Sequence, residues 1–231
     1  MTELPTRQEH RSDAVSLIIK DIRQRILLQQ FQPGEHLREI QLAGQYQVSR
    51  STLRTALQAL EGEGLILTQV NGSRIVLPFT AQSAEDIYLV REMLEQQAIE
   101  LIFHRLPVNY TPLVQVLDQI AAVVRDRQDV RREVCISLDM AFHRALFVVA
   151  ESWALLRCWD TLAPIMDALL NLNTTDAYQV DYVQDFYAKH KQICDGVVTR
   201  SPELVSQMAV HIRDARSISL QQLAVYRRVL S

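Results

Sequence analysis

Asp139 and His143 are spaced four residues apart in a segment whose pattern predicts a helix, so both side chains project from one face. His190 and His211 each lie in the middle of a later predicted helix. One carboxylate and three imidazoles suit Zn, Ni, Mn or Fe, with open positions for water or a ligand. The spacing alone does not bring three helices together, so satisfied or exposed polar residues remain the alternative to a metal site.

A second group of polar residues opens the helix that is predicted to follow Val48. It consists of Ser49, Arg50, Ser51, Thr52 and Arg54. A helix that enters the major groove of DNA needs such residues at its N-terminal end, because arginine donates two hydrogen bonds to guanine and hydroxyls hold phosphates. Arg38, at the start of the preceding short helix, is placed to reach the same DNA backbone. The alternative is that Arg50 and Arg54 only solvate an exposed helix face.

The elements around these residues follow one another in a recognisable order. Apolar residues recur at helical spacing from about Asp13 to Gln30, a short helix is predicted over about 39–46, and Ser49 is the predicted N-cap of the next helix. That helix has an apolar stripe at Leu53, Ala56, Leu57 and Leu60. Two strand-like runs, 65–70 and 74–79, flank Asn71 and Gly72, a dipeptide typical of hairpins, and this tip could touch the minor groove or a phosphate.

This order predicts a winged helix-turn-helix over residues 1–77, with 1–12 as a flexible tail, followed by a linker over 78–82. Ser83 is expected to cap the next helix, and everything after it has helical periodicity. The predicted helices are about 83–105, 111–127, 130–150, 152–173, 178–199 and 202–228. The chain is therefore expected to be mainly α, with an all-α six-helix bundle over 83–231.

Composition narrows the class of protein. The 231 residues are 48% apolar with few glycines and prolines, which favours a globular, helix-rich chain. No charged-then-apolar leader and no apolar run of about 20 residues is present, so we expect a cytoplasmic protein without a membrane partner. Three widely spaced cysteines are expected to be reduced.

The charge is distributed unevenly along the chain. Residues 1–80 hold nine Lys or Arg and eight Asp or Glu, whereas residues 81–231 hold 15 Lys or Arg and 19 Asp or Glu. We therefore expect DNA contact to be confined to the first third of the chain.

Three stretches carry a family resemblance. They run from Pro33 to Ala43, from Val48 to Leu57 and from Leu60 to Ile66, and they resemble the N-terminal domain of GntR-family regulators. The resemblance implies a winged helix whose arginines at the positions of Arg38, Arg50 and Arg54 contact an operator. The chain departs from the family at Thr52, where proline is common, at Thr55, where glutamate is common, and at the wing tip. These departures bear on base preference more than on the fold.

The helical part resembles the FCD effector domain of the FadR subfamily, and its six helices resemble the VanR-like branch. Metal-binding members carry Asp-x3-His on one helix and a further histidine on each of two later helices, which matches Asp139, His143, His190 and His211. The resemblance implies a divalent metal, with Zn or Ni favoured, and a small carboxylic-acid effector. Arg91 matches an arginine common on the first helix of such domains, and the alternative is a surface ion pair with Glu95.

These observations predict a DNA-binding regulator that is not an enzyme. We expect a repressor that acts as a homodimer on a (pseudo)palindromic double-stranded operator and dimerises through its helical domain. Two alternatives stay open, a metal-dependent hydrolase and a DNA-binding protein with a purely structural metal. The hydrolase lacks an evident general base beside the ligand motifs and leaves the winged helix unexplained.

Overall fold

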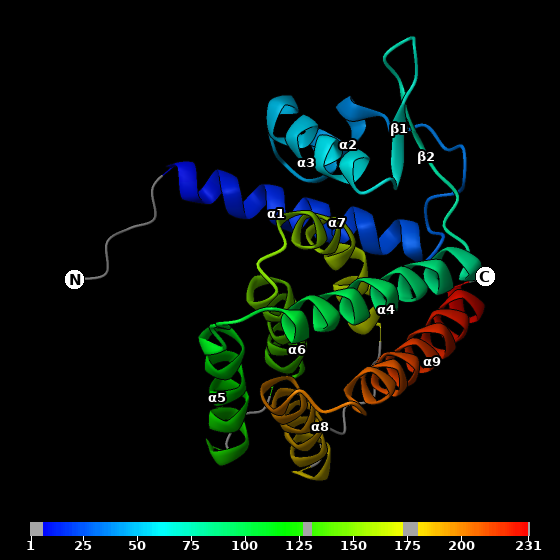
Figure 1. Ribbon diagram of the computed structural model, residues 1–231. Helices are drawn as coiled ribbons and strands as arrows, with labels where there is room; N and C mark the ends of the chain where they lie inside the picture. The colour runs from blue at the N-terminus through cyan, green and yellow to red at the C-terminus, as the bar shows by residue number, and fades with distance from the viewer. Residues whose placement is uncertain (1–6, 127–130, 173–179, 231) are drawn as a thin grey trace. The chain divides into compact units, whose positions relative to one another are not determined.

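The computed structural model describes residues 7–126, 131–172 and 180–230, and the chain divides into two compact units. One unit comprises Met1–Ser83 together with Leu223–Ser231, and the other comprises Ala84–Gln222. Within the described residues there are nine helices and two strands, so the expectation of a mainly α fold is confirmed (Figure 1). No helix in this described part has the length and apolar character needed to cross a membrane.

The first unit contains the elements of a winged helix in the predicted order. They are α1 (Arg7–Leu27), α2 (Glu39–Gln45), α3 (Arg50–Gly62), β1 (Ile66–Thr68) and β2 (Arg74–Val76). Both strands are shorter than predicted. A third segment pairs with β2 through a bridge between His36 and Ile75, which no local pattern had indicated.

Helix α1 begins and ends earlier than predicted. Its apolar face at Ile18, Ile22 and Ile26 is buried, as the periodicity indicated. The first turns, from Arg7 to Ser12, are helical although they were expected to form a flexible tail. They carry no apolar stripe, so hydrophobic periodicity could not detect them. The helix ends at Leu27 because Gln29 takes a positive φ of 58°, which a right-handed helix cannot contain.

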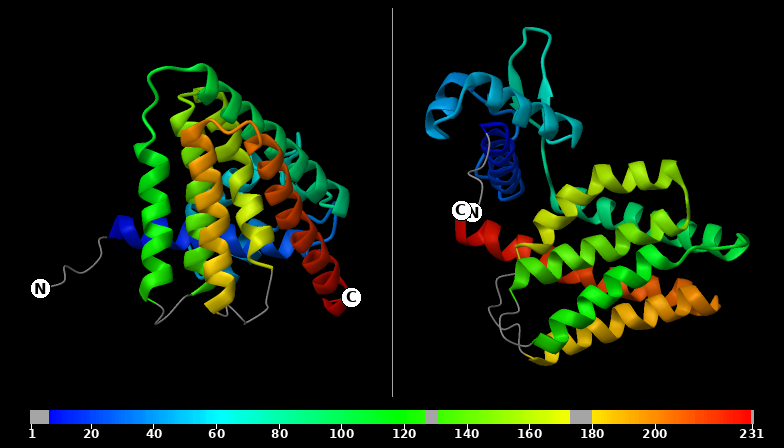
Figure 2. Two further views of the ribbon diagram at one scale, coloured as in Figure 1. Left: turned by 60° about the horizontal axis from the view of Figure 1, so that its bottom comes forward. Right: turned by 90° about the vertical axis from the view of Figure 1, so that its left-hand side faces the viewer.

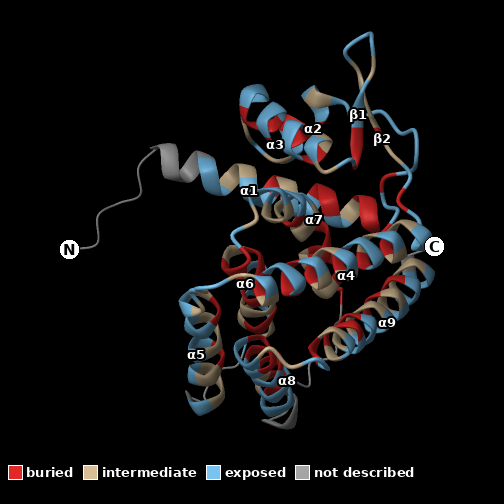
Figure 3. Ribbon diagram, viewed as in Figure 1, coloured by how far each residue is buried: buried red, intermediate tan, exposed pale blue. Residues whose placement is uncertain are grey.

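Helix α3 is fixed at its start by a cap and along its length by packing. Ser49 is the N-cap, and its hydroxyl accepts a hydrogen bond of 3.1 Å from the backbone N–H of Thr52. The predicted stripe is buried, and α3 packs against α1. Figure 3 colours the buried parts of α3 red. Arg23 of α1 donates two hydrogen bonds of 2.6 Å to the Glu63 carboxylate, which ties the end of α3 to α1. Packing and this ion pair therefore both join α3 to α1.

The wing is a hairpin whose turn differs from a two-residue Asn-Gly loop. Strands β1 and β2 are antiparallel, with Ile66 opposite Val76 and Thr68 opposite Arg74. The N–H of Gly72 donates to the carbonyl of Gln69, and Gly72 takes a φ of +82°. Glycine suits this position because the left-handed conformation carries no steric cost without a Cβ.

The second unit is built from six helices. They are α4 (Ala81–His104), α5 (Thr111–Asp126), α6 (Arg132–Val149), α7 (Trp153–Leu170), α8 (Val180–Thr199) and α9 (Leu204–Leu230). Helix α5 lies beside α6 and α8, and α6 lies beside α7 (Figure 2). The predicted helix ends at residues 127, 130, 173 and 178 lie outside the described residues. Cys135, Cys158 and Cys194 are free thiols, as expected.

Two differences from the predicted boundaries lie where the two units meet in the sequence. Helix α4 begins at Ala81, inside the predicted linker, because Thr80 and not Ser83 is its cap. The hydroxyl of Thr80 accepts from the N–H of Ser83 and the hydroxyl of Ser83 accepts from the N–H of Thr80, each at 3.1 Å. At the other end, the final residues of α9 group with the first unit. Arg227 donates there to the carbonyls of Leu27 and Phe79.

Candidate DNA-binding surface and metal centre

The start of α3 presents most of the predicted DNA contacts to solvent. Arg50, Ser51 and Arg54 are exposed, and so is Arg38 just before α2. Ser49 is exposed too, but its hydroxyl is already bonded to Ser51 and to the helix backbone. The exposed side chains form one polar surface at the N-terminal end of the helix. The first backbone N–H groups of a helix have no partner within it, so they can bind an anion such as a phosphate.

Thr52 needs a correction. Its side chain is only 6% exposed, and its hydroxyl lies 2.8 Å from the Ser49 hydroxyl. A side chain in this position supports the helix cap and does not face DNA. The sequence pattern could not separate Thr52 from its neighbours, because a small hydroxyl residue is equally compatible with either face.

Sequence reasoning missed an acidic residue that organises this surface. Glu39, the first residue of α2, accepts a hydrogen bond of 2.8 Å from Nε of Arg54. Its other carboxylate oxygen pairs with Arg74 at the start of β2. Glu39 therefore links α3 to the wing, and it holds Arg54 in one orientation while that side chain stays about half exposed.

The wing tip is exposed at Asn71 and Gly72. The side-chain oxygen of Asn71 accepts a hydrogen bond of 2.9 Å from the N–H of Ser73 and so stabilises the turn. The tip can therefore approach a phosphate or the minor groove with its backbone and with the amide nitrogen of Asn71.

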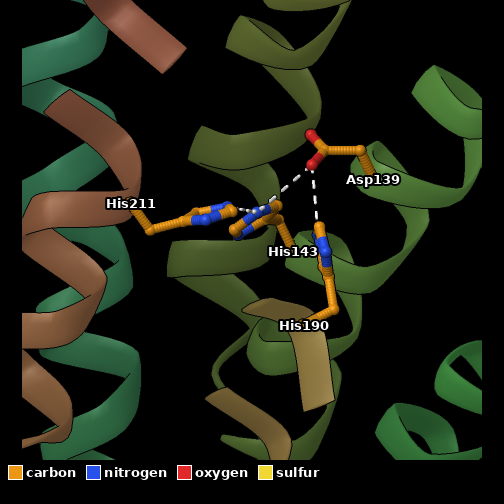
Figure 4. A group of neighbouring side chains, drawn as sticks. All are labelled: Asp139, His143, His190 and His211. Carbon is orange, nitrogen blue, oxygen red and sulfur yellow. Dashed lines mark hydrogen bonds and ion pairs between the residues drawn. The ribbon is translucent and has the colours of Figure 1, made fainter. Parts of the chain in front are cut away.

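The four predicted metal ligands lie together in the second unit. Asp139 and His143 come from α6, His190 from α8 and His211 from α9, and Figure 4 shows the four side chains pointing toward one another. One donor atom from each lies within 4.8 Å of the others. Two ligands of one zinc-sized ion lie at most about 4.4 Å apart, because each bond is about 2.0–2.2 Å long. Small side-chain shifts therefore suffice to place all four on one ion.

Hydrogen bonds determine which nitrogen each buried histidine offers. Nδ1 of His190 lies 2.7 Å from the carbonyl of Phe186, which can only accept, so Nδ1 carries the proton. Nε2 of the neutral ring is then an acceptor, yet it lies 3.1 Å from the Asp139 carboxylate, another acceptor. A proton or a metal ion must lie between them. This donor set fits a divalent transition metal.

The protonation of the cluster favours metal binding as well. Burial lowers the pKa of His143, and burial together with the neighbouring His143 lowers the pKa of His211 to about 3. Burial alone would raise the pKa of Asp139, but His143 and His190 outweigh it and keep the pKa below its usual value. At neutral pH Asp139, His143 and His211 thus offer deprotonated ligands, which metal binding requires.

Arg91 and Glu95 do form the ion pair that was one of the alternatives, but the pair is not at the surface. Both side chains are fully buried, with Nε of Arg91 2.7 Å from Glu95. The other carboxylate oxygen of Glu95 lies 2.7 Å from Nδ1 of His143. Among the described residues, Nη1 and Nη2 of Arg91 have no hydrogen-bond partner. The role of Glu95 could not be inferred from sequence, because His143 lies 48 residues away.

A cavity of about 140 Å³ opens beside the cluster. Asp139, His190 and His211 are among its polar lining residues, which also include Asp185, Lys189, Asp214 and Ser219. Ile136, Leu170 and Ile218 are among its apolar lining residues. Arg91 is not among the lining residues. The cavity is smaller than a site for a drug-sized ligand, which usually has about 300–1,000 Å³.

We predict that the metal-free protein loses stability as the pH falls from about 6.5 to 4.5. An unfolded histidine takes up a proton below about pH 6.5, whereas His211 stays neutral in the folded state because its pKa is about 3. The free energy of unfolding is therefore highest above pH 6.5 and declines as the pH approaches 3, by at most about 1.4 kcal/mol per pH unit for one proton. Urea denaturation at pH 7.5, 5.5 and 4.5 measures it. The decline should be smaller in a His211→Gln variant, and an equal decline would refute the role of His211.

Comparison with known proteins identifies both units. Residues 15–76 match the family described as "Bacterial regulatory proteins, gntR family", and residues 86–214 match the FCD domain. The Nta operon transcriptional regulator of Aminobacter aminovorans is 34% identical over 134 residues, which cover 55% of this chain and 59% of that protein. The gluconate operon transcriptional repressor of Bacillus subtilis is 26% identical over 192 residues, covering 81% of this chain and 76% of that one.

Solved structures share the fold. Escherichia coli McbR/YncC superposes with a TM-score of 0.64 at 17% identity, covering 90% of this chain and 98% of that one. The Lar protein, which controls expression of the Listeria monocytogenes agr system, superposes with a TM-score of 0.69 at 17% identity, covering 95% of this chain and 99% of that one. The family and its curated relatives are transcriptional regulators and not enzymes, which contradicts the hydrolase alternative. The chain therefore belongs to the GntR family of DNA-binding regulators, with an N-terminal winged helix and a C-terminal FCD domain.

Proposed function

We propose that this regulator is a repressor whose operator affinity is controlled by a small carboxylic acid bound at a metal ion. Asp139, His143, His190 and His211 would hold the ion. The observation that carries the proposal is the partly buried contact between Nε2 of His190 and the Asp139 carboxylate, two acceptors 3.1 Å apart that need a proton or a metal ion between them. Zn or Ni suits the three imidazoles best, and Mn or Fe also fits the donor set.

The cavity supports a small effector. When bound, the metal supplies a positive charge to which a carboxylate can bind, and the apolar lining residues suit a short hydrocarbon chain. Arg91 is the proposed second contact, because two of its buried nitrogens lack a partner. Since Arg91 does not line the cavity in this structure, that contact requires side chains to move on binding.

The DNA-binding part of the proposal concerns a homodimer. The helix α3 of each copy reads one half-site through Arg50 and Arg54. The sugar-phosphate backbone of the operator is contacted by Arg38, Ser49, Ser51 and the wing tip at Asn71 and Gly72. A (pseudo)palindromic operator therefore needs two copies of the chain. Repression is supported by relatives named as repressors of gluconate and D-xylose operons. The effector has to change operator affinity by only about 1–3 kcal/mol.

A thermal-shift screen of metabolic carboxylic acids against the metal-loaded protein tests this proposal. A ligand that binds only the folded state at 100 times its Kd stabilises it by about 2.7 kcal/mol, which raises the melting temperature of a chain of this size by about 5–10 °C. The acids that raise it are then added to an operator-binding assay, where the effector should lower the affinity.

The matched control is a variant without the metal ligands, Asp139→Ala with His143→Ala, in which the same acids should cause no shift. If metal removal unfolds the second unit and no acid changes operator affinity, the metal is structural. An acid that shifts both proteins equally would bind elsewhere, and the proposed effector site would be wrong.

A further inference from the structure

We infer that Glu95 is a positioning residue that keeps the proton of His143 on Nδ1 and so leaves Nε2 free for the metal. The inference rests on the proposed metal site. Neither the spacing of residues nor the family matches point to Glu95, which lies on α4 while the four ligands lie on α6, α8 and α9.

The hydrogen bond between Glu95 and His143 dictates the tautomer of the ring. Oε2 of Glu95 lies 2.7 Å from Nδ1 of His143, and both side chains are fully buried. An ionised carboxylate only accepts, so Nδ1 must donate. A neutral imidazole has one N–H, and Nε2 then carries a lone pair. That lone pair lies in the cluster, 3.1 Å from Nε2 of His211 and 3.8 Å from Asp139.

Arg91 keeps the Glu95 carboxylate ionised and oriented. Its Nε donates to Oε1 at 2.7 Å, so the two carboxylate oxygens have separate partners. Arg91, Glu95 and His143 thus form one buried chain of charge-assisted hydrogen bonds, which we call the Arg91–Glu95–His143 relay.

His190 offers an internal comparison. Its Nδ1 donates to the neutral carbonyl of Phe186, whereas Nδ1 of His143 donates to a carboxylate. A carboxylate partner increases the basicity of the ligating nitrogen more than a neutral one does. Within this cluster, His143 is therefore the imidazole whose affinity for the metal depends most on a side chain that does not touch the ion.

The substitution Glu95→Gln separates this role from packing. Glutamine has nearly the same shape but a single acceptor oxygen, while Arg91 and His143 each require an acceptor. If that oxygen stays with Arg91, the amide NH₂ faces Nδ1 of His143 and favours the ring with its proton on Nε2. That tautomer cannot ligate a metal through Nε2 without losing the proton.

Two measurements test the inference. Nitrogen-15 NMR of the metal-free full-length protein reports the tautomer of His143, which should carry its proton on Nδ1 in the wild type and on Nε2 in Glu95→Gln. Titration with Zn²⁺ against a chelating dye gives the metal affinity. An outer-sphere partner of this kind contributes about 10–100-fold, so the Kd for Zn²⁺ should rise by that factor in Glu95→Gln.

The control variant is Glu92→Gln, which removes a carboxylate from the same helix outside the relay and should bind Zn²⁺ like the wild type. Wild-type protein with the proton on Nε2 of His143 would overturn the inference without any variant, even if Glu95→Gln fails to fold. Equal Zn²⁺ affinity in wild type and Glu95→Gln would overturn it while leaving the metal site intact. A wild type that binds no Zn²⁺ or other divalent metal would overturn the proposed function together with this inference.

Discussion

Protein carrying Asp139→Ala and His143→Ala should contain no bound metal when it is purified without a chelator, whereas the wild type should contain about one ion per chain. The two residues supply half of the four donors and the only carboxylate of the cluster. Loss of one partner outside the first coordination sphere already costs about 10–100-fold in affinity. Loss of two direct ligands should therefore cost well over 100-fold. Elemental analysis by mass spectrometry measures the content and identifies the metal.

A matched variant, His104→Ala, removes an imidazole that lies outside the cluster at the exposed end of α4. It should retain the wild-type metal content. Equal metal content in the wild type and in the double variant would contradict the site, because the metal would then be bound by other residues.

Much of the first unit could be predicted because its signals are local. The cap at Ser49, the apolar stripe from Leu53 to Leu60 and the hairpin at Gly72 each depend on residues close in sequence. The errors also have local causes. The first turns of α1 are polar and carry no periodicity. The reciprocal cap of Thr80 and Ser83 starts α4 at Ala81, two residues before the predicted start at 83.

The metal centre could be predicted only in part from residue spacing. The four-residue separation of Asp139 and His143 places both on one face of α6, but the approach of His190 and His211 depends on how three helices pack. The family resemblance supplied that information for the ligands. It did not supply Glu95, whose hydrogen bond with His143 joins α4 to α6 over 48 residues of sequence and leaves no periodic signal.

Glu39 illustrates the same limit in the DNA-binding unit. Its position directly after Arg38 indicates only an acidic residue near the start of a helix, where the helix dipole stabilises a carboxylate. Its partners, Arg54 and Arg74, lie 15 and 35 residues away. Because Glu39 neutralises part of their charge, the net attraction of this surface for DNA depends on the exposed Arg38 and Arg50 as well as on Arg54.

The combined substitution Arg50→Ala and Arg54→Ala should nearly abolish specific operator binding. A good arginine–guanine contact discriminates by about 1–3 kcal/mol, and well-separated positions add, so the double variant should lose about 2–6 kcal/mol, or about 30-fold to 20,000-fold in affinity. The operator is first selected from random DNA by the wild-type protein, and fluorescence anisotropy at physiological salt then measures both proteins. Arg144→Ala, which removes a surface arginine of α6 paired with Asp160, is the control and should bind normally.

The single variants assign a role to each arginine. If Arg54 reads a base, Arg54→Ala lowers the affinity for the operator more than the affinity for random DNA. If Arg54 contacts a phosphate, the substitution lowers both affinities alike, and the slope of log affinity against log salt concentration becomes shallower by about one. Arg54→Ala also leaves Glu39 with Arg74 alone, so part of its effect should reach the wing. Because both guanidinium groups project from the first turns of α3, an unchanged affinity in the double variant would contradict the placement of this helix in the major groove.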